Sequence, residues 1–242
     1  MLISILHQDW ETRYDLYIHN HSLIDPYVDL EYSDLGEFII SSTVGNYNTI
    51  SNRPKIHWFH GTRVIDINSF KRNGILPLNE IYPRITETID DIAKSMGIYK
   101  VPITTDLQKI RRELIDNKMS YSGDLGPCAM LLYDAVINAK SYGCHEYTIE
   151  PEIVRDYTEL EYGDQSSKVL SEYIRVSKPA VVEFIEPTNA IDKADFDHII
   201  GTVFTYLYYL HHNKSVDIMC NTCFTGNGKA VPPENIVSIT LL

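Results

Sequence analysis

The segment best suited to chemistry in this sequence reads His-Gly-Thr-Arg and follows directly on a predicted strand over Lys55–His60. It places the side chain of His60, the backbone of Gly61 and the hydroxyl of Thr62 at one strand end. These groups can hydrogen-bond a ribose and a carboxamide edge, and the glycine lets a ligand approach the backbone closely. The alternative interpretation is a strand-end histidine that is hydrogen-bonded within the fold and binds no ligand.

The residues around this segment extend the pattern. The stretch WFHGTRVIDINSFKRNGILPL, from Trp58 to Leu78, resembles the first motif of the ADP-ribosyltransferase superfamily. In that motif a strand ends in His-Gly-Thr and leads into a helix that ends before a Gly-Ile-x-Pro turn. Both the poly(ADP-ribose) polymerase-like branch and the tRNA 2′-phosphotransferases have it. More weakly, Met130–Ile137 resembles an inner strand of such folds, and Lys229–Leu242 resembles their closing strand.

The resemblance implies an NAD site. In the family the histidine binds the NAD ribose and a tyrosine stacks on the nicotinamide, so His60, Gly61, Thr62 and Arg63 are expected to bind NAD as a substrate. Tyr121 is the first choice for the stacking ring, because it precedes the segment that resembles the next inner strand. Two further tyrosines compete for this role: Tyr82 and Tyr133.

The family also needs an acid on a later strand, which polarises the ribose hydroxyl. The stretch just before the closing strand, SVDIMCNTCFTG, contains no glutamate. We rank Glu183 first, because a carboxylate on the apolar strand over Ala180–Ile185 is costly unless it is hydrogen-bonded or functional. A plain alternative is that Glu183 faces water at a sheet edge. Asp217 ranks second and Glu234 third, and Glu186 is a further option.

The resemblance favours an NAD-dependent ADP-ribosyltransferase, a glycosyl-transferring enzyme that modifies a protein or a nucleic acid and acts as a toxin-like or defence-related effector. If so, the catalytic acid and His60 should lie on adjoining central strands. A second hypothesis is an inactive transferase-like module that binds a nucleotide or a protein partner, which the missing glutamate favours. A third is transfer of an RNA 2′-phosphate to NAD.

Composition limits these hypotheses. The chain has 21 Lys and Arg against 33 Asp and Glu, a formal charge of −12, which argues against a broad nucleic-acid footprint. It contains no apolar run long enough for a membrane span. Its first residues lack the features of a signal peptide, so a cytoplasmic protein that does not bind membranes is expected.

Two smaller clusters have alternative interpretations. Cys220 and Cys223 form a C-x-x-C that Cys128, Cys144 and His145 could complete as a zinc site, but the second half is loosely spaced and we expect no metal. The basic residues over Lys109–Arg112 with Lys118, and the pair Lys71 and Arg72, could steer a nucleic acid or pyrophosphate. We favour solvated helix faces instead.

Helices and strands alternate without a regular βαβ pattern. This predicts an α+β fold with mixed central sheets and flanking helices, as one compact domain over residues 1–242, in which residues 1–54 could form an N-terminal extension. The resemblance implies that this domain is ADP-ribosyltransferase-like. The expected strands are Glu37–Ser42, Lys55–His60, Ala129–Ile137, Ala180–Ile185 and Asn235–Leu242. The expected helices are Asp66–Asn73, Thr86–Met96, Thr105–Lys118, Glu152–Leu160, Ser166–Val176 and Ala194–Asn213.

Overall fold

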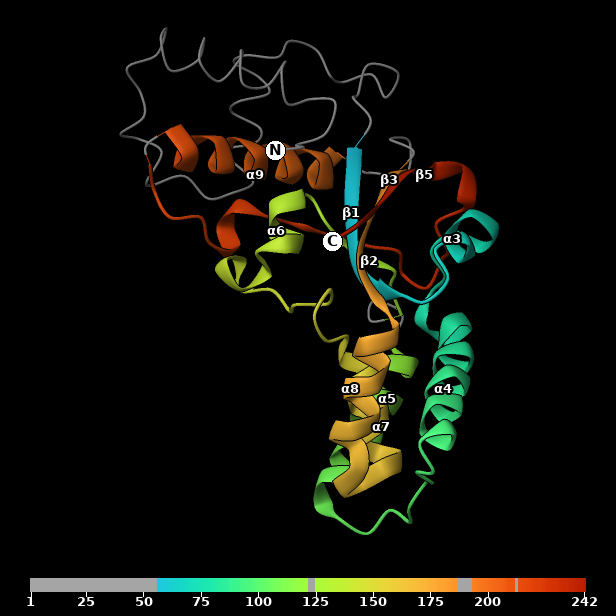
Figure 1. Ribbon diagram of the computed structural model, residues 1–242. Helices are drawn as coiled ribbons and strands as arrows, with labels where there is room; N and C mark the ends of the chain where they lie inside the picture. Colours follow the sequence, from blue (N-terminus) through green and yellow to red (C-terminus); the bar gives the residue numbers. More distant parts are fainter. Residues whose placement is uncertain (1–55, 122–124, 187–192, 212) are drawn as a thin grey trace, which may run out of the picture. The chain divides into compact units, whose positions relative to one another are not determined.

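A five-stranded sheet runs through the protein in the order β4-β2-β1-β3-β5. The computed structural model describes residues 56–121, 125–186, 193–211 and 213–242 (Figure 1). The strand expected over Glu37–Ser42 lies outside these residues. The sheet and its helices agree with the predicted α+β class. The strands are β1 (Ile56–Val64), β2 (Cys128–Met130), β3 (Lys178–Glu186), β4 (Cys223–Thr225) and β5 (Ile236–Leu241).

The strand β1 occupies the middle of the sheet. Its first four residues are buried without alternation, and His60 and the three residues after it are half-buried. A continuous apolar run of this kind is typical of a strand that is covered on both faces. The prediction of a strand over Lys55–His60 is confirmed, and the strand continues to Val64.

The strands β3 and β5 pair antiparallel at one end of the sheet. The register places Ala180 opposite Leu241 and Glu183 opposite Ser238, and a bulge then skips Val237. Both strands were predicted, and β3 extends beyond the predicted bounds at each end. The strand β5 therefore forms an edge, and β3 lies between it and β1.

The contacts group the described residues into two compact units. Unit 1 comprises described residues of 56–59, 130–145 and 185–223, and unit 2 comprises those of 60–129, 146–184 and 224–242. Each of the strands β1 to β4 passes from one unit into the other.

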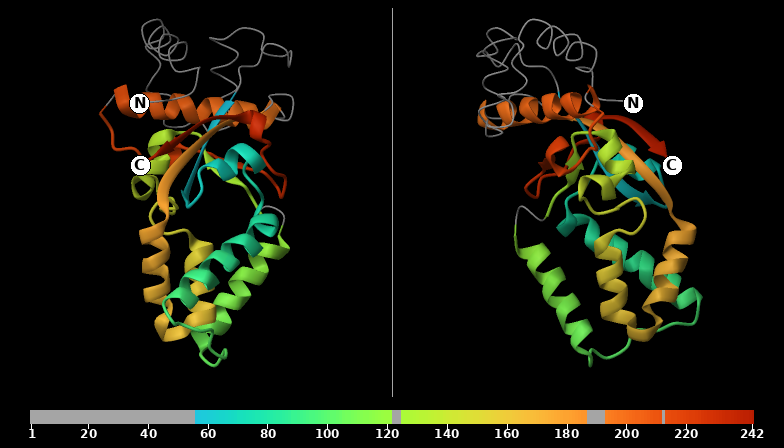
Figure 2. Two further views of the ribbon diagram at one scale, coloured as in Figure 1. Left: turned by 45° about the vertical axis from the view of Figure 1, so that its right-hand side comes forward. Right: turned by 90° about the vertical axis from the view of Figure 1, so that its left-hand side faces the viewer.

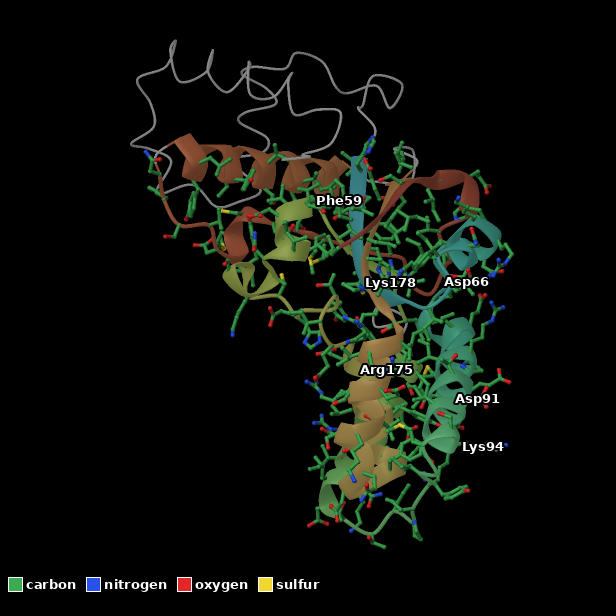
Figure 3. All side chains as sticks on the ribbon, in the orientation of Figure 1. Phe59, Asp66, Asp91, Lys94, Arg175 and Lys178 are labelled. Atoms are coloured by element: carbon green, nitrogen blue, oxygen red, sulfur yellow. The ribbon has the colours of Figure 1, made fainter. Side chains whose placement is uncertain are left out.

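Unit 2 contains a helical part. Four of its helices, α4, α5, α7 and α8, pack side by side (Figure 2). Their bounds, with those of the short α3, are Asn68–Asn73 (α3), Leu78–Ser95 (α4), Asp106–Ser120 (α5), Glu152–Tyr162 (α7) and Ser166–Val176 (α8). The helices α4, α7 and α8 share a core of Ile89, Ala93, Val154, Tyr157, Tyr162, Val169 and Tyr173. The polar side chains of Asp91 and Lys94 project from α4 on its exposed side (Figure 3).

Most of these helices agree with the prediction. Thr105 caps α5 through a capping box with Gln108, and α8 has the predicted bounds. The predicted helix start at Thr86 was wrong, because α4 begins at Leu78 and continues through Pro83. Proline removes one helical hydrogen bond, but Tyr82 and Ile85 on either side of it pack against the buried core. Tertiary packing thus outweighs the local signal.

Gly74 ends α3 with a backbone that other residues rarely adopt. Its φ is +70°, and a Cβ at this position would lie 1.9 Å from the carbonyl oxygen of Val231. The next residue, Ile75, exchanges two backbone hydrogen bonds with Val231, each 2.9 Å long. The expected glycine stop is therefore confirmed, and it also brings two distant segments into contact.

Unit 1 contains α6 (Tyr133–Ile137), α9 (Lys193–His211) and the short helices η4 (Ala139–Tyr142) and η7 (Ile218–Cys220). The helix α9 confirms the predicted one. The strand predicted over Ala129–Ile137 is wrong beyond Met130, because α6 follows it. The buried residues of α6 are Ala135 and Val136, and Leu131 and Leu132 just before the helix are also buried. So short an apolar run does not distinguish a strand from a helix.

None of the helices in the described part of the chain has the length and apolar content needed to cross a membrane.

Candidate functional site

The imidazole of His60 is anchored to the neighbouring strand. The strands β1 and β2 pair antiparallel with Phe59 opposite Met130. His60 Nδ1 lies 2.7 Å from the backbone oxygen of Cys128. A carbonyl oxygen can only accept, so Nδ1 carries the hydrogen and donates it. Burial lowers the pKa of His60, although the hydrogen bond to Cys128 acts in the opposite direction. The neutral ring then presents Nε2 as an acceptor.

The two residues after His60 complete the motif. Gly61 and Thr62 are half-buried on the same strand. Thr62 Oγ1 lies 3.4 Å from the backbone oxygen of Arg63, which is long for a hydroxyl donor. The hydroxyl can therefore turn to a ligand at little cost.

Arg63 uses its guanidinium within the protein. Its Nε donates to Ser177 Oγ at 2.9 Å, and one terminal nitrogen donates to Thr148 O at 2.8 Å. The other terminal nitrogen donates to the backbone oxygens of Ile174 at 2.7 Å and Ser177 at 2.9 Å. The structure therefore gives Arg63 a structural role, in contrast to the NAD contact that the sequence motif implies.

Two acceptors of Arg63, Ile174 and Ser177, lie where α8 passes into β3. Arg175 on α8 and Lys178 at the start of β3 mark this junction (Figure 3). A cation at the C-terminus of a helix also interacts favourably with the helix dipole. Arg63 thus ties the end of β1 to the start of β3.

Glu183 lies on the strand next to the one that carries His60. The strands β1 and β3 are neighbours in the sheet, as expected for the strands of the histidine and the acid, and both residues belong to unit 2. Glu183 is half-buried, and its carboxylate accepts a hydrogen bond of 2.7 Å from Ser238 Oγ. The bulge in β5 begins directly after this pair. Bulges are frequent next to active sites.

The other acids have structural surroundings. Asp217 caps η7 and accepts a hydrogen bond of 2.9 Å from the backbone N–H of Met219. It belongs to unit 1, whereas His60 belongs to unit 2. Glu234 is exposed in a short turn, as expected next to two prolines. Glu186 accepts a hydrogen bond of 3.2 Å from Trp58 Nε1, and burial raises its pKa.

The three candidate tyrosines differ in exposure. Tyr121 follows α5 and is 66% exposed. Tyr82 and Tyr133 instead make edge-to-face contacts, with Tyr157 and Phe59 respectively. Packing accounts for these two rings, and the ring of Tyr121 remains accessible to a ligand.

The cysteines do not assemble a metal site in the described residues. No group of three His, Cys, Asp or Glu side chains there has a geometry that could hold a metal ion. Cys220 is buried, and burial raises its pKa to about 11. Cys223 is exposed, and its sulfur lies 3.5 Å from that of Met130.

The predicted basic patch is largely neutralised within the protein. Arg111 and Lys118 of α5 both form ion pairs of 3.2 Å with the buried Asp156 of α7. Lys109 forms an ion pair with Asp106. These contacts favour the interpretation of α5 as a structural helix over a surface that steers nucleic acid.

Sequence reasoning missed a polar cluster between α4 and α7. Asp90 accepts hydrogen bonds from the hydroxyls of Tyr157 at 2.9 Å and Tyr162 at 2.6 Å, and Lys100 lies 2.8 Å away. Burial alone would raise the pKa of Asp90, but these three partners outweigh it and lower the pKa. No local spacing links the residues, so only the packed helices reveal the cluster.

Comparisons with known proteins add no relative. A scan against protein-family models found no match, and searches of curated proteins and of solved structures found no similar protein.

Proposed function

We propose that this protein is an NAD-dependent ADP-ribosyltransferase in which His60, Gly61 and Thr62 bind NAD and Glu183 is the catalytic carboxylate. The observation that carries the proposal is the imidazole of His60, which a hydrogen bond of 2.7 Å to Cys128 holds in one tautomer. This bond directs the acceptor nitrogen Nε2 to a ligand hydroxyl.

The proposed roles follow from the chemistry of each group. Nε2 of His60 accepts from a ribose hydroxyl, and the backbone at Gly61 and the hydroxyl of Thr62 hydrogen-bond the carboxamide edge. As nicotinamide leaves, positive charge develops on the ribose, and a carboxylate in a poorly solvated site stabilises it. Glu183 suits this role because it lies on the adjoining strand and Ser238 orients its carboxylate.

Release of nicotinamide from NAD tests the catalytic part. We expect the protein to release nicotinamide, and Glu183→Gln to reduce the rate by about a hundredfold, as for loss of other groups that stabilise transition-state charge. Glu87→Gln is the matched control, since Glu87 is exposed on α4. An active protein whose rate survives Glu183→Gln would remove Glu183 from the mechanism. Asp217→Asn is then the next variant to measure.

A second candidate function is NAD or nucleotide binding without catalysis. It is favoured by the absence of a glutamate from the stretch just before the closing strand, where the carboxylate of Asp217 instead caps η7 through the backbone N–H of Met219. It predicts tight binding of NAD with no nicotinamide release in the presence of protein or nucleic-acid acceptors. Transfer of an RNA phosphate is less favoured, because Arg63 beside the motif is engaged by backbone oxygens.

A further inference from the structure

The edge strand β5 borders a hollow of about 380 Å³ in unit 2. One side of the hollow is formed by Ile67 and Lys71, at and near α3, and the other by Pro233 and residues 236–239. The strand runs along the outside of β3 at the end of the sheet (Figure 2). The hollow thus lies beside backbone groups that a sheet edge presents.

The register shows which backbone groups these are. The backbone N–H of Leu242 donates to the backbone oxygen of Pro179 at 3.0 Å, so the backbone hydrogen-bonding groups of Leu242 point toward β3. Hydrogen-bonding direction alternates along an antiparallel strand. Ile239 and Leu241 therefore direct their N–H and C=O groups away from β3. In the described part of the chain, no strand pairs with that side.

The sequence of β5 does not protect this edge. Natural edge strands are usually shielded by charged residues or proline. The strand reads IVSITL and contains neither, and Val237 and Leu241 are 47% and 42% exposed. The bulge that skips Val237 lies at the beginning of the strand and leaves the paired stretch from Ser238 to Leu241 regular. Such an edge is suited to pairing with another segment.

The charge in the hollow defines the kind of segment. Lys71 is the charged side chain that lines it, whereas the whole chain carries a formal charge of −12. The neighbouring Arg72 is paired with Asp66 at 2.6 Å. A local cation beside apolar side chains favours a partner that carries a carboxylate among apolar residues.

We infer that β5 and the hollow beside α3 bind an extended segment of another protein, which adds as a strand along β5 and places an acidic side chain at Lys71. Strand addition of this kind takes its affinity from main-chain hydrogen bonds and its specificity from pockets for alternate side chains. The inference goes beyond NAD chemistry and is tested by binding alone. Glu183 bonds to Ser238 of the same strand, so the bound segment would lie near the proposed catalytic carboxylate.

Selection from a phage-displayed library of random nine-residue peptides tests this inference on the full chain. Peptides selected on the unmodified protein are synthesised, and their affinities are measured by fluorescence anisotropy. Ile239→Pro removes one outward N–H at a position where an edge strand tolerates proline, and Ile239→Val is its matched control. Lys71→Glu is compared with Arg72→Glu, which makes the same charge change outside the lining residues. Thermal unfolding verifies that each variant is folded.

The expected result is a set of peptides that contain an acidic residue. Their binding should be lost in Ile239→Pro and kept in Ile239→Val, and Lys71→Glu should weaken it about tenfold while Arg72→Glu changes it little. Selection of no peptide, or peptides that bind Ile239→Pro unchanged, would overturn the inference. A concentration-dependent dimer that Ile239→Pro dissociates would also overturn it, because the occupant of β5 would be a second copy.

Discussion

Replacing Arg63 by alanine should destabilise the protein strongly, although Arg63 lies directly beside the proposed NAD site. Its guanidinium makes four hydrogen bonds of 2.7 to 2.9 Å to Thr148, Ile174 and Ser177. Ser177 is buried, and its hydroxyl donates in turn to Tyr173 O at 2.6 Å. Loss of the guanidinium leaves these acceptors without a donor at the junction of α8 and β3.

The size of the effect follows from the kind of bond. A hydrogen bond to a charged group contributes about 1.5–3 kcal/mol. The four bonds share one side chain, so they do not add, and water can reach part of the group. We therefore expect Arg63→Ala to lower the free energy of unfolding by about 3 kcal/mol. For a chain of this size that corresponds to a fall in Tm of about 6–12 °C.

Urea and thermal unfolding measure this prediction. Arg63→Lys keeps the charge but not the planar fork, so it should recover only part of the lost stability. Arg175→Ala is the control, because Arg175 is an exposed arginine that pairs with Glu172 on the same helix, and it should leave Tm unchanged. If Arg63→Ala unfolds like the unmodified protein, the structural role of Arg63 is refuted.

Three further predictions concern other parts of the chain. Gly74→Ala should lower the free energy of unfolding by about 2–5 kcal/mol, since backbone strain and a steric clash combine. Gly97→Ala is the comparison, because Gly97 has a φ of +71° but a Cβ added there would have no atom within 4 Å. It should lower the free energy of unfolding by only about 1–2 kcal/mol. Because the pKa of Asp90 is lowered in the folded protein, the unfolded chain binds its proton at a higher pH, and stability falls as the pH falls through about 4. In Asp90→Asn the urea midpoint should depend less on pH below about pH 5 than in the unmodified protein. An unchanged pH dependence would contradict this. Iodoacetamide at pH 8, followed by peptide mass spectrometry, should label Cys223 well before Cys220, whose pKa is about 11; equal rates would refute the burial argument.

Local signals predicted much of the fold. The helices expected over Thr105–Lys118, Ser166–Val176 and Ala194–Asn213 are present as α5, α8 and α9, and Gly74 ends α3 as expected. Caps, glycine stops and apolar spacing act within a few residues of one another. Such signals determine helix ends largely without the rest of the protein. The central strand β1 could also be predicted from the sequence, because a strand covered on both faces has a continuous apolar run.

Signals that depend on packing were missed. The helix expected to begin at Thr86 begins at Leu78 and continues through Pro83, because the neighbours of this proline are held in the core of the helical part. The apolar run after Met130 continues into α6, and a run of this length does not distinguish a strand from a helix.

The candidate site was predictable only where local sequence determines it. His60 and Glu183 could be chosen from residue type and strand context alone. The Cys128 carbonyl that fixes the ring of His60 comes from a strand 68 residues away. The hydrogen bonds of Arg63 reach across 85 to 114 residues. No pattern along the sequence encodes such contacts, so the structural role of Arg63 and the hydrogen bond that fixes the ring of His60 emerge only from the fold.

Calorimetric titration of NAD tests the central proposal most directly. We expect saturable binding by the unmodified protein and a loss of about tenfold or more in affinity for His60→Ala, because a buried ribose hydroxyl would lose its acceptor. His145→Ala is the control, since it removes a partly exposed imidazole outside the motif and should bind as the unmodified protein does. No binding by the unmodified protein, or equal binding by His60→Ala, would contradict the assignment of this site to NAD.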